Sequence, residues 1–174
     1  MNIELMYAKY NQAGNQTIYH ILSKLSNDDR EKDRGSFYGS LSGMLLHIMG
    51  GTFYFLSMYK EALKNNDAAI KALVSIENLS LPEGNLSSAQ WKETGTALDA
   101  IDAAYVKMAE AIGDSDLKNP VKIDWYGGNP AEVPLQFMLH QLVVHNTHHR
   151  GQISQILDSL KIDNDYSGIN VAFM

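Results

Sequence analysis

Residues 134–160 read PLQFMLHQLVVHNTHHRGQISQILDSL, and this stretch decides the fold. Its apolar residues recur at the spacing of one helix face, and they are Met138, Leu142, Ile153, Ile156 and Leu160. Pro134 suits the first turn of a helix, where its missing N–H would have no partner. The sequence therefore predicts a long amphipathic helix whose apolar face also carries His145, His149 and Gln152.

Three other long helices are predicted upstream, over about residues 4–25, 39–64 and 88–112. The second of these is apolar almost all round, which is typical of the most buried helix in a bundle. A shorter helix is expected over 67–79. Serines that could cap the second and third long helices are Ser36 or Ser40, and Ser87 or Ser88. Four amphipathic helices with little strand predict an all-α fold, a four-helix bundle.

A small β-hairpin is predicted just before the last helix. Residues 121–126 alternate in the manner of a short strand, and residues 127–130 (GGNP) have the composition of a turn. Residues 131–133 can then return as the second strand.

The composition fits one domain that covers residues 1–174. A hydrophobic content of 45% can supply a core, and 20% charged residues is ordinary for a globular protein. The absence of cysteine excludes disulfides and thiolate metal ligands, so any metal must bind to nitrogen and oxygen. A formal net charge of −6 and the lack of a long Lys/Arg run argue against nucleic acid as a partner.

The segment Gly35–Tyr59 contains no charged residue and is long enough to span a bilayer. It also contains four serines, a threonine, five glycines and His47, which make a poor membrane helix. We therefore expect a buried helix and no membrane contact. The N-terminus lacks a basic region followed by an apolar core, so no signal peptide is expected, and the cytoplasm is the expected location.

Four of the six histidines lie within residues 140–149. His145 and His149 are one helical turn apart and about 40° apart around the axis, so both can bind one ion. A zinc peptidase helix would carry Glu after the first His, but Asn146 stands there and such a peptidase is not expected. His148 projects about 100° from His149. Because the apolar face contains His149, we favour His149 as the ligand and place His148 at the flank or rim of the pocket.

His47 is the candidate for a third ligand, because it stands alone in the uncharged segment. A buried histidine needs a partner, and an ordinary hydrogen bond in the core is the alternative interpretation. His20 is expected at the surface of its amphipathic helix. His140 points about 140° away from His145 and is interpreted as structural.

The segment His145–Ile153 (HNTHHRGQI) resembles the signature on the last helix of the DinB/YfiT-like metal-binding bundle proteins. The lead-in Val133–Leu135 and the segments Ser36–Leu41 and Leu46–Ile48 are also similar to that family. The resemblance covers about residues 1–160. The sequence departs from it at Gly50-Gly51, where relatives carry larger or polar residues, and in the tail at 163–168, which lacks a proline-rich end.

The resemblance implies an up-down-down-up four-helix bundle, often paired as a homodimer. It implies one divalent metal ion on His47, His145 and His149, with zinc or nickel as the first candidates and iron or manganese as others. Some relatives are transferases or isomerases that use bacillithiol, mycothiol or glutathione, so the implied partner is a small molecule, a low-molecular-weight thiol. Many relatives have no assigned activity.

Three neutral imidazoles leave an ion with an open position, which is the pattern of catalytic sites. Such an ion can acidify a bound water or bind a thiol as thiolate. We therefore expect a metal-dependent transferase acting with a small thiol. The alternatives are a non-catalytic metal- or ligand-binding protein of a stress response, and a metal-dependent hydrolase. The hydrolase needs a general base, and no Asp or Glu shares a helix face with the three histidines.

Three nearby side chains receive provisional roles. Gln152 could orient a metal ligand or a bound water, or bond to a neighbouring helix. Tyr54, seven residues after His47, lies on the same helix face and could line the pocket or belong to the core. Arg150 points away from the histidines and is expected to form an interhelical or dimer salt bridge.

Overall fold

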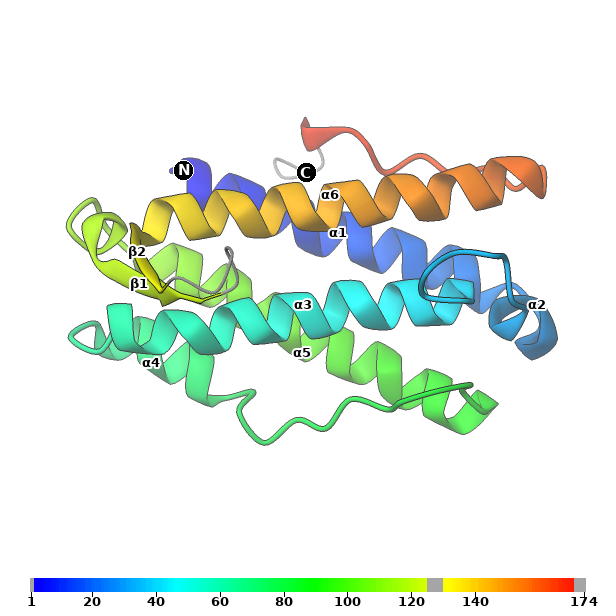
Figure 1. Ribbon diagram of the computed structural model, residues 1–174, viewed down its shortest axis with the longest axis horizontal. Coiled ribbons are helices and arrows are strands. Elements are labelled where there is room, and N and C mark those ends of the chain that lie inside the picture. The colour runs from blue at the N-terminus through cyan, green and yellow to red at the C-terminus, as the bar shows by residue number, and fades with distance from the viewer. Residues whose placement is uncertain (1, 125–129, 171–174) are drawn as a thin grey trace.

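Four long helices form the bundle in the computed structural model, which describes residues 2–124 and 130–170 (Figure 1). They are α1 (Ile3–Ser23), α3 (Leu41–Ala62), α5 (Ser88–Ala111) and α6 (Leu135–Ser159). In Figure 1, α1 and α6 run in one direction while α3 and α5 run in the other, so the connectivity is up-down-down-up as the family resemblance implied. Helix α1 packs on α5, α3 packs on α6, and contacts of α3 with α5 and of α1 with α6 close the bundle.

The shorter elements lie at the two ends of the bundle (Figure 1). They are α2 (Asn27–Glu31), α4 (Asp67–Val74), the single-turn 3₁₀ helix η1 (Asp116–Lys118), β1 (Pro120–Ile123) and β2 (Ala131–Pro134). Helix α4 is shorter than the predicted 67–79 because Ser75–Glu77 continue only as turns. Because α3 and α5 are parallel, the chain must cross back along the bundle before α5, and residues 75–87 make that crossing.

Serine side chains fix where two of the long helices begin. Ser40 Oγ accepts from the N–H of Gly43 and caps α3, so Ser40 rather than Ser36 is the cap. Ser87 and Gln90 form a reciprocal capping box at the start of α5. Both starts follow from residue types that the sequence makes visible.

The predicted hairpin precedes α6. Strands β1 and β2 pair antiparallel with Val121 opposite Val133. Val121 and Ile123 are buried, so the hairpin closes one end of the core. Residues 125–129, where we expected the end of the first strand and most of the turn, lie outside the described residues.

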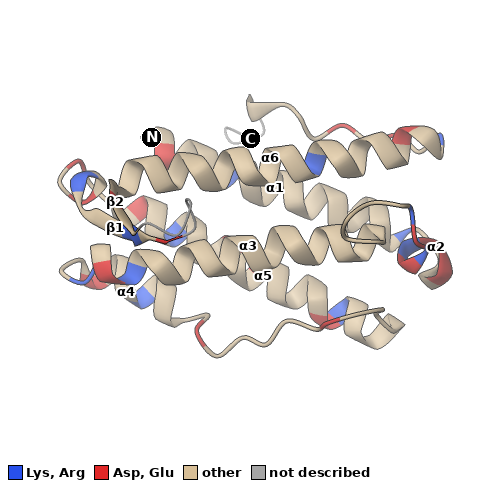
Figure 2. Ribbon diagram, in the orientation of Figure 1, with Lys and Arg blue, Asp and Glu red and all other residues tan. Residues whose placement is uncertain are grey.

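Helix α3 lies among the other helices, and its buried residues include Leu45, Ile48, Met49 and Leu56. The middle of α3 carries no charged residue, whereas α6 carries one well inside the helix (Figure 2). By length and composition alone, α3 could cross a membrane, because an 18-residue window of this helix has a mean hydropathy of 1.3. Half of that 18-residue window is buried inside the bundle. A single core helix of a soluble protein has the same composition, so α3 does not indicate a membrane span.

Candidate metal centre

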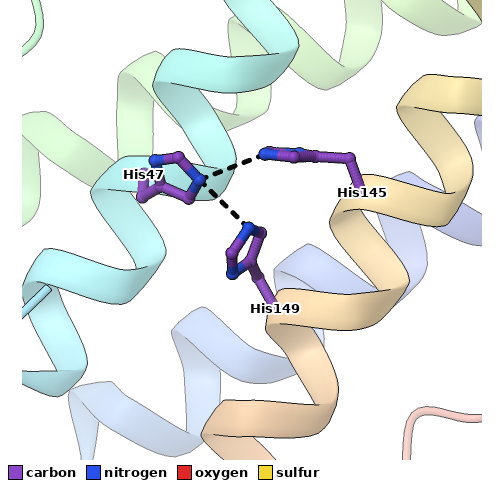
Figure 3. Close-up of side chains that lie close together, drawn as sticks. All are labelled: His47, His145 and His149. Carbon is purple, nitrogen blue, oxygen red and sulfur yellow. Dashed lines mark hydrogen bonds between the residues drawn. The ribbon is translucent and has the colours of Figure 1, made fainter. Parts of the chain in front are cut away.

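Three imidazoles from two antiparallel helices converge at the centre of the bundle (Figure 3). The Nε2 atom of His47 on α3 lies 3.1 Å from Nε2 of His145 and 3.1 Å from Nε2 of His149, both on α6. All three candidate ligand atoms lie within 4.8 Å of one another. Nitrogens bound tetrahedrally to zinc at about 2.0–2.1 Å would be about 3.3 Å apart, so the spacing suits one ion.

The outer ring nitrogens of the two α6 histidines have side-chain partners. His145 Nδ1 lies 3.0 Å from Asn146 Oδ1, and His149 Nδ1 lies 2.8 Å from Gln152 Oε1. An amide oxygen can only accept, so each Nδ1 carries the hydrogen. Both Nε2 atoms therefore present lone pairs to the centre.

The centre holds fewer hydrogens than acceptors. The hydroxyl of Tyr38 lies 2.9 Å from His47 Nε2, so at most two hydrogens, one on that hydroxyl and one on His47, face the group. They cannot give each of the three ring nitrogens a hydrogen bond of its own. A cation would satisfy all three lone pairs at once, so the donor set fits a metal ion.

Burial favours the neutral form of two of these imidazoles, His47 and His149. Burial, followed by repulsion from His149 and His145, lowers the pKa of His47 to about 4. Burial also lowers the pKa of His149, although its hydrogen bond to Gln152 acts in the opposite direction. Neutral imidazole is the form that binds metal, so protons do not compete for His47 near neutral pH.

Gly51 permits the close approach of α3 and α6 at this point. A Cβ atom at residue 51 would lie 2.6 Å from Cε1 of the His145 ring, closer than atoms can approach. The neighbouring Gly50 has no such contact, since its nearest atom is a methyl of Leu81 at 3.9 Å. Of the two glycines that depart from the family pattern, one is required by a site residue.

Tyr38 belongs to the site although no role was predicted for it. Its ring stacks on His47 with centroids 3.9 Å apart and an interplanar angle of 20°. It lies in the connection between α2 and α3, between Gly35 and Gly39, which both have φ of +72°. Helical spacing could not reveal this side chain because it precedes α3. The only signal was its place in the segment 36–41 that resembles the family.

A cavity of about 660 Å³ reaches His47 from the surface. Its walls come from α2, from the connection to α3, from α3 itself and from the crossing segment 81–85. Tyr38 separates it from a second cavity of about 360 Å³, which Gln152 and Arg34 help to line. The first cavity carries the carboxylates of Glu31, Asp33 and Glu83 and no Lys or Arg.

The other predicted site residues lie outside this cluster. His148 is exposed on the flank of α6, with its ring 4.9 Å from that of His149 and its Nε2 3.4 Å from Gln152 Nε2. Tyr54 is 51% exposed and does not line the cavity at His47, because it lies two turns further along α3. Its neighbour Phe55 instead packs against the ring of His145 at 5.8 Å. His20 and His140 are exposed, and His140 makes an edge contact with Tyr7.

The expected salt bridge of Arg150 was wrong. Arg150 is 2% exposed, and no carboxylate of the described residues lies within ion-pair distance of it. Its guanidinium donates to Asn11 Oδ1 at 2.9 Å, to Asn15 Oδ1 at 3.3 Å and to Thr147, and it covers the ring of Tyr10. The flank of α6 that seemed to face solvent or a partner instead packs on α1.

Asp102 on α5 completes this buried polar network. It accepts from Asn11 Nδ2 at 3.0 Å and from Asn15 Nδ2 at 3.1 Å. Burial raises the pKa of Asp102 to about 7, while the hydrogen bond from Asn15 and the charge of Arg150 act to lower it.

Comparison with known proteins agrees with this geometry. Residues 1–160 match the sequence model of the DinB family. Searches of curated proteins and of solved structures found no match.

Proposed function

The chain belongs to the DinB family, and from the geometry of its imidazoles we propose that it binds one divalent metal ion on His47, His145 and His149. One observation carries the proposal: three ring nitrogens converge with too few hydrogens to satisfy them. A cluster of neutral acceptors without donors is unfavourable unless a cation binds there. Zinc and nickel are the first candidates because the family resemblance implies them, whereas a three-imidazole site by itself accepts several divalent metals in the usual order of affinity.

An enzymatic role is supported by access to the site. A structural metal site is closed by its ligands, whereas His47, one of the three candidate ligands here, lines a surface cavity that could admit a small molecule. A divalent ion held by three neutral imidazoles would act as a Lewis acid that lowers the pKa of a thiol or water bound to it. Tyr38, whose hydroxyl lies 2.9 Å from His47 Nε2, would offer a hydrogen-bond donor to a substrate bound near the three imidazoles.

Within that role we favour transfer involving a small thiol, the activity implied by resemblance to thiol-dependent relatives. The acidic lining of the cavity favours some thiols over others. Glu31, Asp33 and Glu83 would repel a thiol that carries several carboxylates. We therefore expect a neutral or amine-bearing thiol to bind better than glutathione.

Metal-dependent hydrolysis is the second candidate, because the same carboxylates offer a general base. Both carboxylate oxygens of Glu31 are shielded from solvent and have no hydrogen-bond partner among the described residues. This group comes from α2 rather than from the histidine-bearing helices, which is why sequence spacing did not find it. A non-catalytic binding protein is the third candidate and is less well supported by the open cavity.

Elemental analysis tests the metal proposal. We expect about one divalent ion per chain in the wild type and near-complete loss in His47→Ala and His145→Ala, because two imidazoles hold an ion far less tightly than three. His20→Ala and His140→Ala, both exposed, are the matched controls and should keep the ion. A wild type without metal, or a neutral His47→Ala change, would refute the proposal.

We further propose a cytoplasmic homodimer, as the family resemblance implies. The outer face of α6 exposes Phe137 and Val144 at 48% and 63%, seven residues apart on one stripe. Light scattering of the purified protein, beside Val144→Lys, tests this proposal. A dimer that persists in the variant would place the interface elsewhere.

A further inference from the structure

Asn146 connects the candidate metal centre to the buried polar network. Its side chain is completely buried, and it sits between His145 and α1. Its Oδ1 faces His145 Nδ1 at 3.0 Å, while its Nδ2 lies 2.8 Å from Asn11 Oδ1. Since an amide has an accepting end and a donating end, the way it faces decides which nitrogen of His145 carries the hydrogen.

The orientation of Asn11 is fixed by groups that cannot reverse. Arg150 can only donate, and its Nη1 lies 2.9 Å from Asn11 Oδ1. On the other side, Asn11 Nδ2 meets Asp102 Oδ1 at 3.0 Å. Turning the Asn11 amide over would oppose donor to donor at Arg150, whatever the charge of Asp102.

The orientation of Asn146 follows from that of Asn11. Its Nδ2 must face the Asn11 oxygen, and the same Nδ2 lies 2.9 Å from Thr52 Oγ1. Thr52 gives its own hydrogen to the carbonyl of Ile48 at 2.9 Å, so its oxygen accepts from Asn146. Two independent acceptors therefore hold the amide nitrogen away from His145 and leave only Oδ1 for the ring.

We propose that Asn146 is a positioning residue that holds His145 in the Nδ1–H tautomer, and that Arg150, Asn11 and Thr52 set its direction. The inference rests on the proposed function in that the Nε2 lone pair so exposed is the one offered to the metal. The buried network therefore acts on the metal site as well as on the fold. Arg150 lies on the face of α6 that packs on α1, and through Asn11 and Asn146 it determines which ring nitrogen of His145 carries the hydrogen.

His149 provides the internal contrast. Its partner Gln152 is half-buried, and the Gln152 nitrogen lies 3.4 Å from His148 Nε2 at the surface, not in a buried network. Among the described residues, no group of fixed polarity is hydrogen-bonded to Gln152, so nothing prevents that amide from turning. We therefore expect a single tautomer at His145 and a less strictly held one at His149.

Nitrogen NMR of the metal-free protein tests the inference directly. Long-range ¹H–¹⁵N correlation spectra at pH 8 distinguish the Nδ1–H and Nε2–H tautomers of each histidine. We expect His145 to be entirely Nδ1–H in the wild type. A mixture of tautomers at His145, or the Nε2–H form, would overturn the inference without requiring any variant to fold.

Two substitutions at residue 146 then separate positioning from stability. Asn146→Ala should allow both neutral tautomers at His145. It should lower zinc affinity by roughly 10–100-fold, the usual effect of losing a partner of a metal-bound histidine. Asn146→Asp keeps an acceptor at His145 but loses the bonds to Asn11 and Thr52, so it should be unstable yet retain Nδ1–H. Zinc affinity that follows stability rather than tautomer across the two variants would contradict the positioning role.

Gln152→Ala is the matched control on the other histidine. It should change the His149 signals and leave His145 as Nδ1–H. The outcomes also keep the two proposals apart. A locked His145 in a protein that binds no zinc would refute the metal site alone, whereas zinc binding with a mixed tautomer would refute the role of Asn146 alone.

Discussion

The two faces of α6 between residues 145 and 150 present opposite kinds of polar cluster. His145 and His149 face α3, where ring nitrogens with lone pairs gather around one point. Asn146 and Arg150, each the next residue along, face α1, where donors and acceptors alternate through Asn11. One residue of helical rotation, about 100°, separates the two environments.

The two clusters differ in how many hydrogens they hold for their hydrogen-bond acceptors. A buried polar cluster that holds helices together pairs its donors with acceptors, because each unpaired group costs about 1–3 kcal/mol. A cluster with a surplus of lone pairs is expected to need a ligand that accepts electron pairs. The network with Arg150 should therefore contribute to folding, and the histidines should contribute to binding.

Removing the guanidinium should give the largest change in stability. Arg150→Met removes the donor to Asn15 Oδ1, leaves Asn11 Oδ1 with Asn146 Nδ2 as its donor, and removes the buried cation whose charge acts on Asp102. We expect the free energy of unfolding to fall by about 3–5 kcal/mol, measured by urea denaturation with chelator present. His145→Ala on the other face should change it by about 1 kcal/mol or less. Equal losses would end the distinction between the two faces.

Added metal should stabilise only through the histidine face. At a free zinc concentration about 100 times the dissociation constant, the wild type should gain about 2.7 kcal/mol in unfolding free energy. Arg150→Met should gain less at the same zinc concentration, because Asn11 loses the donor that fixes its amide and Asn146 is then directed by Thr52 alone. His47→Ala should gain nothing, and thermal denaturation with and without zinc measures all three.

The paired glycines of α3 offer a sharper test of the binding face. Gly51→Ala pushes a methyl group into the His145 ring and should lower zinc affinity by about tenfold, or about 1.4 kcal/mol. Gly50→Ala meets only a Leu81 methyl at ordinary contact distance and should leave affinity unchanged. Competition with a chromophoric chelator measures both, and equal affinities would show that the His145 ring can shift freely.

The smallest expected effect is on the pH dependence of the metal-free protein. Because the pKa of His47 is about 4 in the folded state and near 6.5 when unfolded, its contribution is present above pH 6.5 and lost as pH falls toward 4. Urea unfolding at pH 7.5 and at pH 4.5 measures how much unfolding free energy the protein loses on acidification. His47→Gln should reduce that loss by about 1 kcal/mol or less, because His47 is only partly buried. The exposed His20→Gln should not alter the slope.

The sequence predicted the features that depend on local spacing. Apolar periodicity predicted the four helices, serines marked the starts of α3 and α5, and a four-residue interval put His145 and His149 on one face. The convergence of His47 with them needed the family resemblance, because spacing cannot say which faces of two helices meet.

Features that depend on distant partners were not predictable. Arg150 was expected to form an interhelical or dimer salt bridge, but it bonds instead to Asn11 and Asn15, more than 130 residues away in the chain. Tyr38 enters the site from a connection whose path no periodicity describes. The cavity at His47 requires the crossing segment to be placed, and that segment has no regular structure to predict.

The crossing segment 75–87 has a consequence for how this protein could diversify. Residues 81–85 form one wall of the cavity at His47, but they belong to neither helix that carries a histidine. Insertions and deletions are tolerated in such surface connections far better than in packed helices. Selection can therefore remodel the entrance, and with it the choice of small molecule, while the constellation of imidazoles is inherited unchanged.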